Sequence, residues 1–183
     1  MLDLSLIPSE DEQKLPPVHL WKPDFCGDID MLIKANGEWF HEGGLLRRPA
    51  MVKMFSRILW YEKGEYFLVT PVEKVRIKVE DAPFLVKQYQ SKQHPDGLYY
   101  IEFLTITGDK LTLGKNGCSL WLENFNGQAK PYVAARYDMK ASISRQVYYA
   151  LVELGVARDI DGQSHHFIQS GNEFFSLGLL EEE

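Results

Sequence analysis

The fold is decided by one stretch, residues 26–84, which reads CGDIDMLIKANGEWFHEGGLLRRPAMVKMFSRILWYEKGEYFLVTPVEKVRIKVEDAPF. It begins with apolar residues at every second position, and this period of two predicts a strand over residues 28–34. Asn36-Gly37 follows, and because both residues tolerate positive φ, the pair predicts a tight hairpin turn. The stretch therefore opens with a β-hairpin.

A helix is predicted over residues 49–60. Pro49 suits a first helical turn, where its missing N–H would be unpaired in any case. Two strands are predicted after the helix, at 66–69 and 75–79, and Pro71 between them indicates an edge, a bulge or a bend. The helix is predicted from apolar residues that recur at helical spacing: Met51, Val52, Phe55, Ile58 and Leu59.

The first residues, 1–25, are polar and punctuated by prolines, which predicts an extended arm with a short helix near residues 9–14. Apolar side chains in this arm would be poorly soluble if they were free, so we expect the arm to lie against the body of the protein. Trp21 is the expected anchor.

Beyond residue 84 the pattern is that of an antiparallel meander followed by a second helix. The helix is predicted over 144–154, with a serine cap and Gly155 at its end. The other expected elements are strands at 99–107, 111–113, 119–122 and 132–137, a polar loop at 123–130, and a hairpin across 170–172.

Together these elements predict an α+β fold of two similar lobes, each an antiparallel β-sheet with one main helix. We expect an arm at 1–25, a first lobe at 26–90 and a second lobe at 91–180. The order strand, helix, strand, strand occurs twice, which suggests an internal duplication. The alternative is that the order arises by chance, because residue identity between the halves is negligible.

Composition excludes several classes of protein. A formal net charge of −6 argues against nucleic acid, since affinity for phosphates rests on Lys and Arg. No apolar run has the length of a membrane helix and the start lacks a signal-peptide pattern, so we expect a cytoplasmic protein. Cys26 and Cys118 belong to no CxxC pair, so we expect neither a disulfide framework nor a zinc site, and no cofactor.

The strongest candidate for a ligand site is a run of mixed charge beside Pro71. Lysine and arginine here are suited to the carboxylate or phosphate of a small polar or anionic ligand. The competing interpretation is a solvated strand face with ordinary ion pairs, each contributing less than about 1 kcal/mol. The candidate ligand-binding residues are Arg47, Arg48, Thr70, Glu73, Lys74 and Arg76.

Three catalytic or metal-binding alternatives are weaker. Cys26 with His41 has the residue types of a thiol nucleophile and its base, although cysteine more often serves as a small buried hydrophobe. Asp28 and Asp30 share a strand face, as a hydrolase or metal site requires, but such carboxylates more often pair with Arg. His165-His166 point to opposite faces of a strand, so they do not share one ion easily.

Several motifs in this order and spacing resemble a bacterial family known as domain of unknown function 1285. They are CGDIDM at 26–31, Gly37-Glu38-Trp39-Phe40, Arg47-Arg48, YFLVTPVEK at 66–74 and VEDAPF at 79–84. The resemblance covers about Leu15 to Leu180. It implies a two-part α+β fold with repeated structural motifs and a suggested role in signal transduction. It implies no catalytic residues.

The sequence contains no motif with a known chemical mechanism. We therefore expect a non-enzymatic regulatory module that binds a small polar ligand between its lobes, or a protein partner. One alternative is a hydrolase that uses Cys26 or the Asp28 and Asp30 pair. Another alternative is an interaction module whose exposed strand near Pro71 accepts a partner strand. The aromatic residues either line a cleft or, more simply, fill the core.

Overall fold

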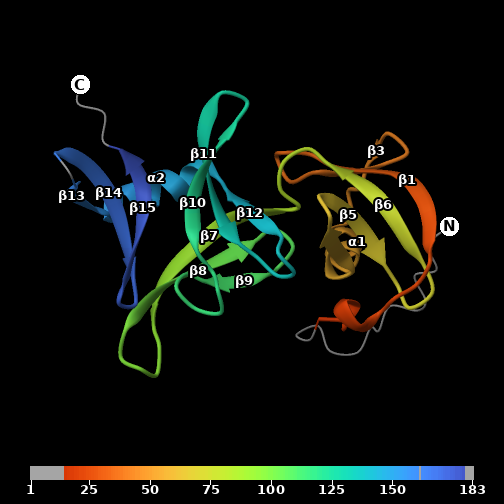
Figure 1. Cartoon of the computed structure of the whole chain (residues 1–183), viewed down its shortest axis with the longest axis horizontal. Coiled ribbons are helices and arrows are strands. Elements are labelled where there is room, and N and C mark those ends of the chain that lie inside the picture. Colours follow the sequence, from red (N-terminus) through yellow and green to blue (C-terminus); the bar gives the residue numbers. More distant parts are fainter. Residues whose placement is uncertain (1–14, 161, 180–183) are drawn as a thin grey trace. The chain divides into compact units, whose positions relative to one another are not determined.

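The computed structural model describes residues 15–160 and 162–179, and the chain divides into two compact units between Pro83 and Phe84 (Figure 1). The boundary that we expected after residue 90 falls inside strand β7 (Phe84–Gln93). That strand belongs to the second unit because it forms a hairpin with β8 (Tyr99–Thr105). The short helix expected near residues 9–14 lies outside the described residues.

The first unit contains a six-stranded sheet in the order β3-β2-β1-β6-β5-β4. Its central strands, β1 and β6, are parallel, and all other neighbours are antiparallel. Helix α1 (Pro49–Arg57) connects β3 to β4. The strands are β1 (Phe25–Ile33), β2 (Trp39–His41), β3 (Gly44–Leu45), β4 (Leu59–Glu62), β5 (Glu65–Val69) and β6 (Lys74–Val79).

Helix α1 is shorter than predicted, because the residues after Ile58 form strand β4. Leu59 pairs with Leu68 and Trp60 with Phe67 across an antiparallel ladder. Lys63 and Gly64, with φ of 52° and 84°, form the two-residue turn of this hairpin. This dipeptide therefore joins two strands.

The second unit contains another six-stranded sheet, in the order β10-β11-β12-β7-β8-β9, again with a parallel central pair, β7 and β12. Helix α2 (Arg145–Leu154) follows β12, and a three-stranded antiparallel sheet follows the helix. The remaining strands are β9 (Lys110–Thr112), β10 (Leu120–Phe125), β11 (Gln128–Ala134), β12 (Lys140–Ile143), β13 (Val156–Ile160), β14 (Gln163–Ser170) and β15 (Glu173–Leu179).

The second unit corrects two predictions. The polar loop expected at 123–130 is a hairpin of β10 and β11 that turns at Asn126-Gly127, with φ of 52° and 82°. The strand expected at 132–137 lies at Gln128–Ala134, and β12 after it was not predicted. Both strands of the hairpin are exposed at its tip. The residues there are polar because they face solvent, although their backbone has regular strand structure. The helix at 144–154 and the hairpin across 170–172 agree with α2, β14 and β15.

The two large sheets have the same topology, which confirms the duplication. Adding six to each strand number of the first sheet gives the strand order of the second. The helices differ, because α1 lies between the third and fourth strands whereas α2 follows the sixth. The repeat is therefore a repeat of sheets, and each unit adds its helix at a different point.

The turn between the first two strands of each sheet shows how closely the repeat is kept. In the first unit the backbone N–H of Lys34 donates to the carbonyl of Glu38 (2.9 Å), and Asn36 Oδ1 accepts from the N–H of Glu38 (3.0 Å). In the second unit the backbone N–H of His94 donates to the carbonyl of Leu98 (2.9 Å), and Asp96 Oδ1 accepts from the backbone N–H of Leu98 (3.0 Å). One side-chain-assisted turn is thus built twice from different residues.

The described part of the arm, from residue 15 onward, lies against the first sheet, as predicted. Val18, in a short 3-10 helix (Val18–Leu20), is 1% exposed and packs with Phe67 and Val69. Trp21 and Trp60 are partly buried against this cluster. Trp21 is therefore an anchor of the arm. Within the described ranges, no helix has both the length and the apolar character needed to cross a membrane.

Candidate functional site

An ion-pair cluster centred on Arg76 is the most polar feature of the first sheet. The guanidinium of Arg76, on β6, donates from Nε and Nη2 to the two carboxylate oxygens of Asp28 (2.8 and 2.9 Å). Its Nη1 donates to Glu65 Oε1 (2.6 Å). Asp28 lies on β1, directly opposite Arg76 in the parallel ladder, and Glu65 lies at the start of β5. Three strands thus meet at one guanidinium.

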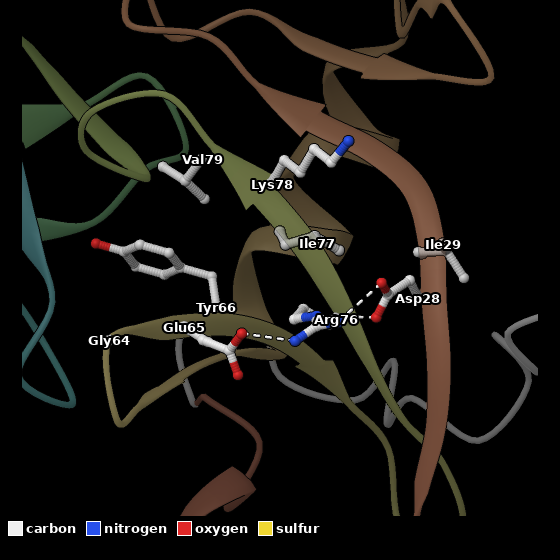
Figure 2. Close-up of a pocket in the computed structure, with 9 residues that line it drawn as sticks. All are labelled: Asp28, Ile29, Gly64, Glu65, Tyr66, Arg76, Ile77, Lys78 and Val79. Carbon is white, nitrogen blue, oxygen red and sulfur yellow. Dashed lines mark hydrogen bonds and ion pairs between the residues drawn. The ribbon is translucent and has the colours of Figure 1, made fainter.

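These residues line a hollow of about 400 Å³. Figure 2 shows Asp28 and Glu65 pointing toward Arg76 from its two sides, while Tyr66 extends its ring away from the cluster. All the lining residues belong to the first unit, and the others are Ile29, Gly64, Ile77, Lys78 and Val79. The site joins four charged side chains to an aromatic and aliphatic wall.

The charges in the cluster stabilise one another. The hydrogen bonds from Arg76 hold the pKa of Asp28 below its ordinary value, and the nearby positive charges of Arg76 and Lys78 lower it further. The same bonds raise the pKa of Arg76. The side chains of Asp28, Glu65 and Arg76 are 61%, 47% and 39% exposed, so both carboxylates and the guanidinium remain open to a ligand.

Lys74, two residues before Arg76, belongs to a separate cluster. Its ammonium donates to Glu62 Oε1 (2.5 Å) and lies 4.2 Å from the centre of the Phe67 ring. Trp60 Nε1 donates to the other oxygen of Glu62 (3.1 Å). The structure therefore assigns the two predicted cations, Lys74 and Arg76, to different carboxylates.

The other residues predicted for the ligand site lie outside the hollow. Thr70 and Glu73 close the β5–β6 turn, with Thr70 N donating to the Glu73 carbonyl (2.8 Å) and Glu73 N to Thr70 Oγ1 (3.1 Å). Arg47 and Arg48 are exposed, and Arg48 is the N-cap residue of α1. Pro71 lies in the turn of β5 and β6, whereas the edge strands of this sheet are β3 and β4. Of the three alternatives predicted for Pro71, an edge, a bulge or a bend, the structure has the bend, and the strands beside it are not edges of the sheet.

The structure separates Cys26 from His41. His41 is opposite Met31 in the β1–β2 ladder, five residues along β1 from Cys26, which corresponds to about 16 Å. Cys26 is exposed and donates to the Asp24 carbonyl (3.3 Å). Asp28 is used by Arg76. Within the described part of the chain, no cluster of three or more His, Cys, Asp or Glu residues is suited to a metal ion.

The paired histidines have unequal contacts. His166 Nε2 hydrogen bonds to the Val152 carbonyl at the end of α2 (2.6 Å), whereas His165 packs its ring 6.2 Å from the centre of the Phe167 ring. Both residues are half-buried. His166 therefore joins β14 to α2.

Sequence analysis did not identify Glu65, Tyr66 and Lys78 as parts of the site. The alternation Lys74, Arg76, Lys78 showed that the three cations share a face of β6, but not which carboxylates face them. A second signal was available, the spacing Trp-x-Glu, which occurs at 60–62 and at 121–123. It marks equivalent positions of β4 and β10 and would have aligned the two halves.

The fold and the site define the class of the protein: an α+β protein of two six-stranded mixed sheets with the same topology and a polar hollow on the first. Residues 16–82 match the family described as domain of unknown function (DUF1285), N-terminal domain. Residues 83–177 match the corresponding C-terminal domain. The chain belongs to the DUF1285 family.

Two solved structures are similar to this chain. A DUF1285 family protein from Silicibacter pomeroyi DSS-3 is 37% identical, with a TM-score of 0.83 over 97% of this chain and 93% of that one. A DUF1285 family protein from Shewanella baltica OS155 is 29% identical, with a TM-score of 0.54 over 67% of this chain and 90% of that one. No curated protein matches the chain.

Proposed function

We propose that the protein is a regulatory module, without catalytic activity of its own, that binds a small zwitterionic molecule in the hollow at Arg76. The observation that carries this proposal is the exposed cluster of two carboxylates, one guanidinium and one ammonium around a single hollow. Such an arrangement offers both signs of charge within the length of an amino acid. A ligand with both an ammonium and a carboxylate is complementary to it.

The hydrogen-bonding capacity of the cluster supports this choice. A guanidinium has five N–H donors, of which Asp28 and Glu65 accept three, so two remain for the carboxylate of a ligand. Lys78 adds an exposed ammonium on the same strand. Each carboxylate oxygen has a further lone pair, and these suit the ammonium of the ligand.

The size and walls of the hollow fit a small molecule. A volume of about 400 Å³ lies in the range of ordinary ligand pockets, roughly 300–1,000 Å³. Tyr66 and Val79 also line it, and the Tyr66 ring, whose centre lies 4.8 Å from that of the Tyr61 ring, is directed away from the charged cluster (Figure 2). An amino acid, free at both its amino and carboxyl groups, has this chemistry.

The test is a thermal-shift screen of the intact chain against free amino acids, each compared with its N-acetyl form and its amide. The acetyl group removes the positive charge and the amide removes the negative one. A ligand at 100 times its Kd adds about 2.7 kcal/mol to the unfolding free energy, which raises the midpoint by several degrees. We expect one free amino acid to do this and both blocked forms to bind at least about tenfold more weakly.

Two variants locate the site. Lys78→Glu should weaken binding of the responding amino acid, whereas Lys87→Glu, an exposed lysine on β7 of the second unit, should leave the Kd unchanged. Equal Kd values for Lys78→Glu and the parent chain would contradict the proposed site. A screen in which no amino acid raises the midpoint would contradict the ligand class.

A further inference from the structure

A second hollow, of about 310 Å³, lies where the arm crosses the first sheet. The arm contributes Trp21 and Lys22 to its wall, and the sheet contributes Trp60, Glu62 and Lys74. The two indoles pack against the buried cluster of Val18, Phe67 and Val69. The walls of this hollow therefore carry two indoles, two lysines and one glutamate, in a chain whose net charge is −6.

The polar side chains of this hollow are held in place by one another. Glu62 accepts from Lys74 Nζ with one oxygen and from Trp60 Nε1 with the other. The bond from Lys74, and then the bond from Trp60, hold the pKa of Glu62 below its ordinary value. Because Glu62 takes one of the three N–H donors of Lys74, whose side chain is 16% exposed, the ammonium retains donors for a ligand.

The second unit contains the same group of side chains at equivalent positions. Lys140 Nζ donates to Glu123 Oε1 (2.8 Å), and Trp121 Nε1 donates to Glu123 Oε2 (3.3 Å). Lys140 lies 4.1 Å from the centre of the Tyr132 ring, as Lys74 does at Phe67. The Trp-Glu-Lys group is therefore a structural part of the repeated sheet.

The first unit adds the arm to this group. Trp21 and Lys22 bring a second indole and a further ammonium to the wall, and the ion pair of Glu62 with Lys74 leaves the charge of Lys22 uncompensated within the hollow. An indole face binds flat aromatic rings, and a fixed ammonium binds an anionic group by charge-assisted hydrogen bonds. The arm thus converts a structural group into a pocket.

We propose that this arm-covered pocket is a second binding site, for a planar aromatic molecule that carries a negative charge. Its ring lies against Trp21 and Trp60, and its anionic group bonds to Lys74 and Lys22. The site shares no lining residue with the hollow at Arg76, so the two proposals are tested by different measurements.

The test uses two fluorescent probes with the same kind of ring system. 8-Anilinonaphthalene-1-sulfonate is an anion, and N-phenyl-1-naphthylamine is its neutral counterpart. Fluorescence titration of the intact chain should give saturable binding of the anion and weaker binding of the neutral probe. Lys22→Glu should raise the Kd of the anionic probe about fivefold, and Lys74→Met should raise it about tenfold. Neither substitution should change the Kd of the neutral probe by more than about twofold.

The repeat supplies matched controls. Lys140→Met removes the equivalent lysine of the second unit, and we expect it to leave the Kd of both probes unchanged. Lys22 is exposed, so Lys22→Glu retains the fold even if Lys74→Met does not. The proposal is overturned if Lys22→Glu binds the anion as tightly as the parent chain. It is also overturned if Lys140→Met raises the Kd of the anionic probe as much as Lys74→Met does.

Discussion

The two six-stranded sheets agree in topology, in one turn and in one side-chain group, but they differ at one position of the central parallel pair. In the first sheet Asp28 of β1 lies opposite Arg76 of β6, and both are exposed to solvent. In the second sheet the same pairing joins Leu85 and Ser142, which are 7% and 1% exposed. One sheet uses the position for an ion pair and the other for packing.

This difference bears on the function proposed for the first unit. In the second sheet the positions equivalent to Asp28 and Arg76 hold Leu85 and Ser142, which form a buried pair. The same sheet topology therefore forms without an ion pair there. The exposed ion pair of the first sheet is therefore not required by the topology. A surface pair of this kind contributes little stability, and the proposed function assigns it contact with a ligand.

The largest contrast between the units is expected at the residue after the shared turn. Trp39, which follows the turn of the first unit, is 1% exposed and stacks on Phe55 with ring centres 6.4 Å apart. Tyr99, at the same place in the second unit, is 60% exposed. Trp39→Ala should lower the unfolding free energy by about 3–5 kcal/mol, and Tyr99→Ala by about 0.5 kcal/mol or less. Chemical denaturation of the two variants measures both values.

Equal losses in these two variants would contradict the burial of Trp39. The urea dependence of the unfolding free energy is the control, because a changed slope would indicate a changed unfolded state instead of lost packing.

The cysteines offer a second contrast, because each unit contains one. Cys26 is exposed, whereas Cys118 is 7% exposed and burial raises the pKa of its thiol to about 11. Since the thiolate is the reacting species, Cys118 should react with a disulfide reagent at pH 8 at least about 100-fold more slowly than Cys26. The time course in native buffer should show one fast thiol, and a second only after denaturant is added. Two fast thiols would show that Cys118 is accessible.

The sequence predicted those elements whose signals are local. The hairpin at Asn36-Gly37 and the hairpin across 170–172 depend on turn residues adjacent to the strands. Helix α2 lies between Ser144 and Gly155, as predicted, although the Ser144 side chain makes no capping hydrogen bond. The predicted end of α1, at residue 60, was wrong because Leu59 and Trp60 continue a helical spacing in the sequence but pair with β5 in the structure. No local pattern distinguishes the two outcomes, since the ladder partner lies in another strand.

The site could be predicted only in part, for the same reason. Arg76 and Lys74 were identified as candidate ligand-binding cations, and their spacing of two residues places them on one face of β6. Their partners depend on the order of strands in the sheet: Asp28 is 48 residues from Arg76 and meets it only because β1 and β6 are parallel neighbours. A charge pattern gives the face of a strand, and the topology gives the partner.

The smallest expected effect concerns the pH dependence of the Asp28 and Arg76 pair. The pKa of Asp28 is lower in the folded chain than its ordinary value near 3.9, because Arg76 bonds to its charged form. A group with a lowered folded pKa stabilises the fold above its ordinary pKa, and this stabilisation is lost as pH falls through the folded value. Asp28→Asn should therefore be less stable than the parent chain at pH 7, and the difference should shrink below about pH 4.

Thermal unfolding of both chains between pH 7 and pH 2 measures this difference. Asp30→Asn is the matched control, since Asp30 is an exposed aspartate on the same strand and none of the three side-chain bonds of Arg76 goes to it. Asp28 is exposed, so the shift in midpoint should be small, and the direction with pH is the decisive observation. A difference that stays constant down to pH 2 would show that the carboxylate charge of Asp28 contributes nothing to the fold. Asp28 would then add no charge-dependent stability to the first sheet, just as the uncharged Leu85 adds none to the second.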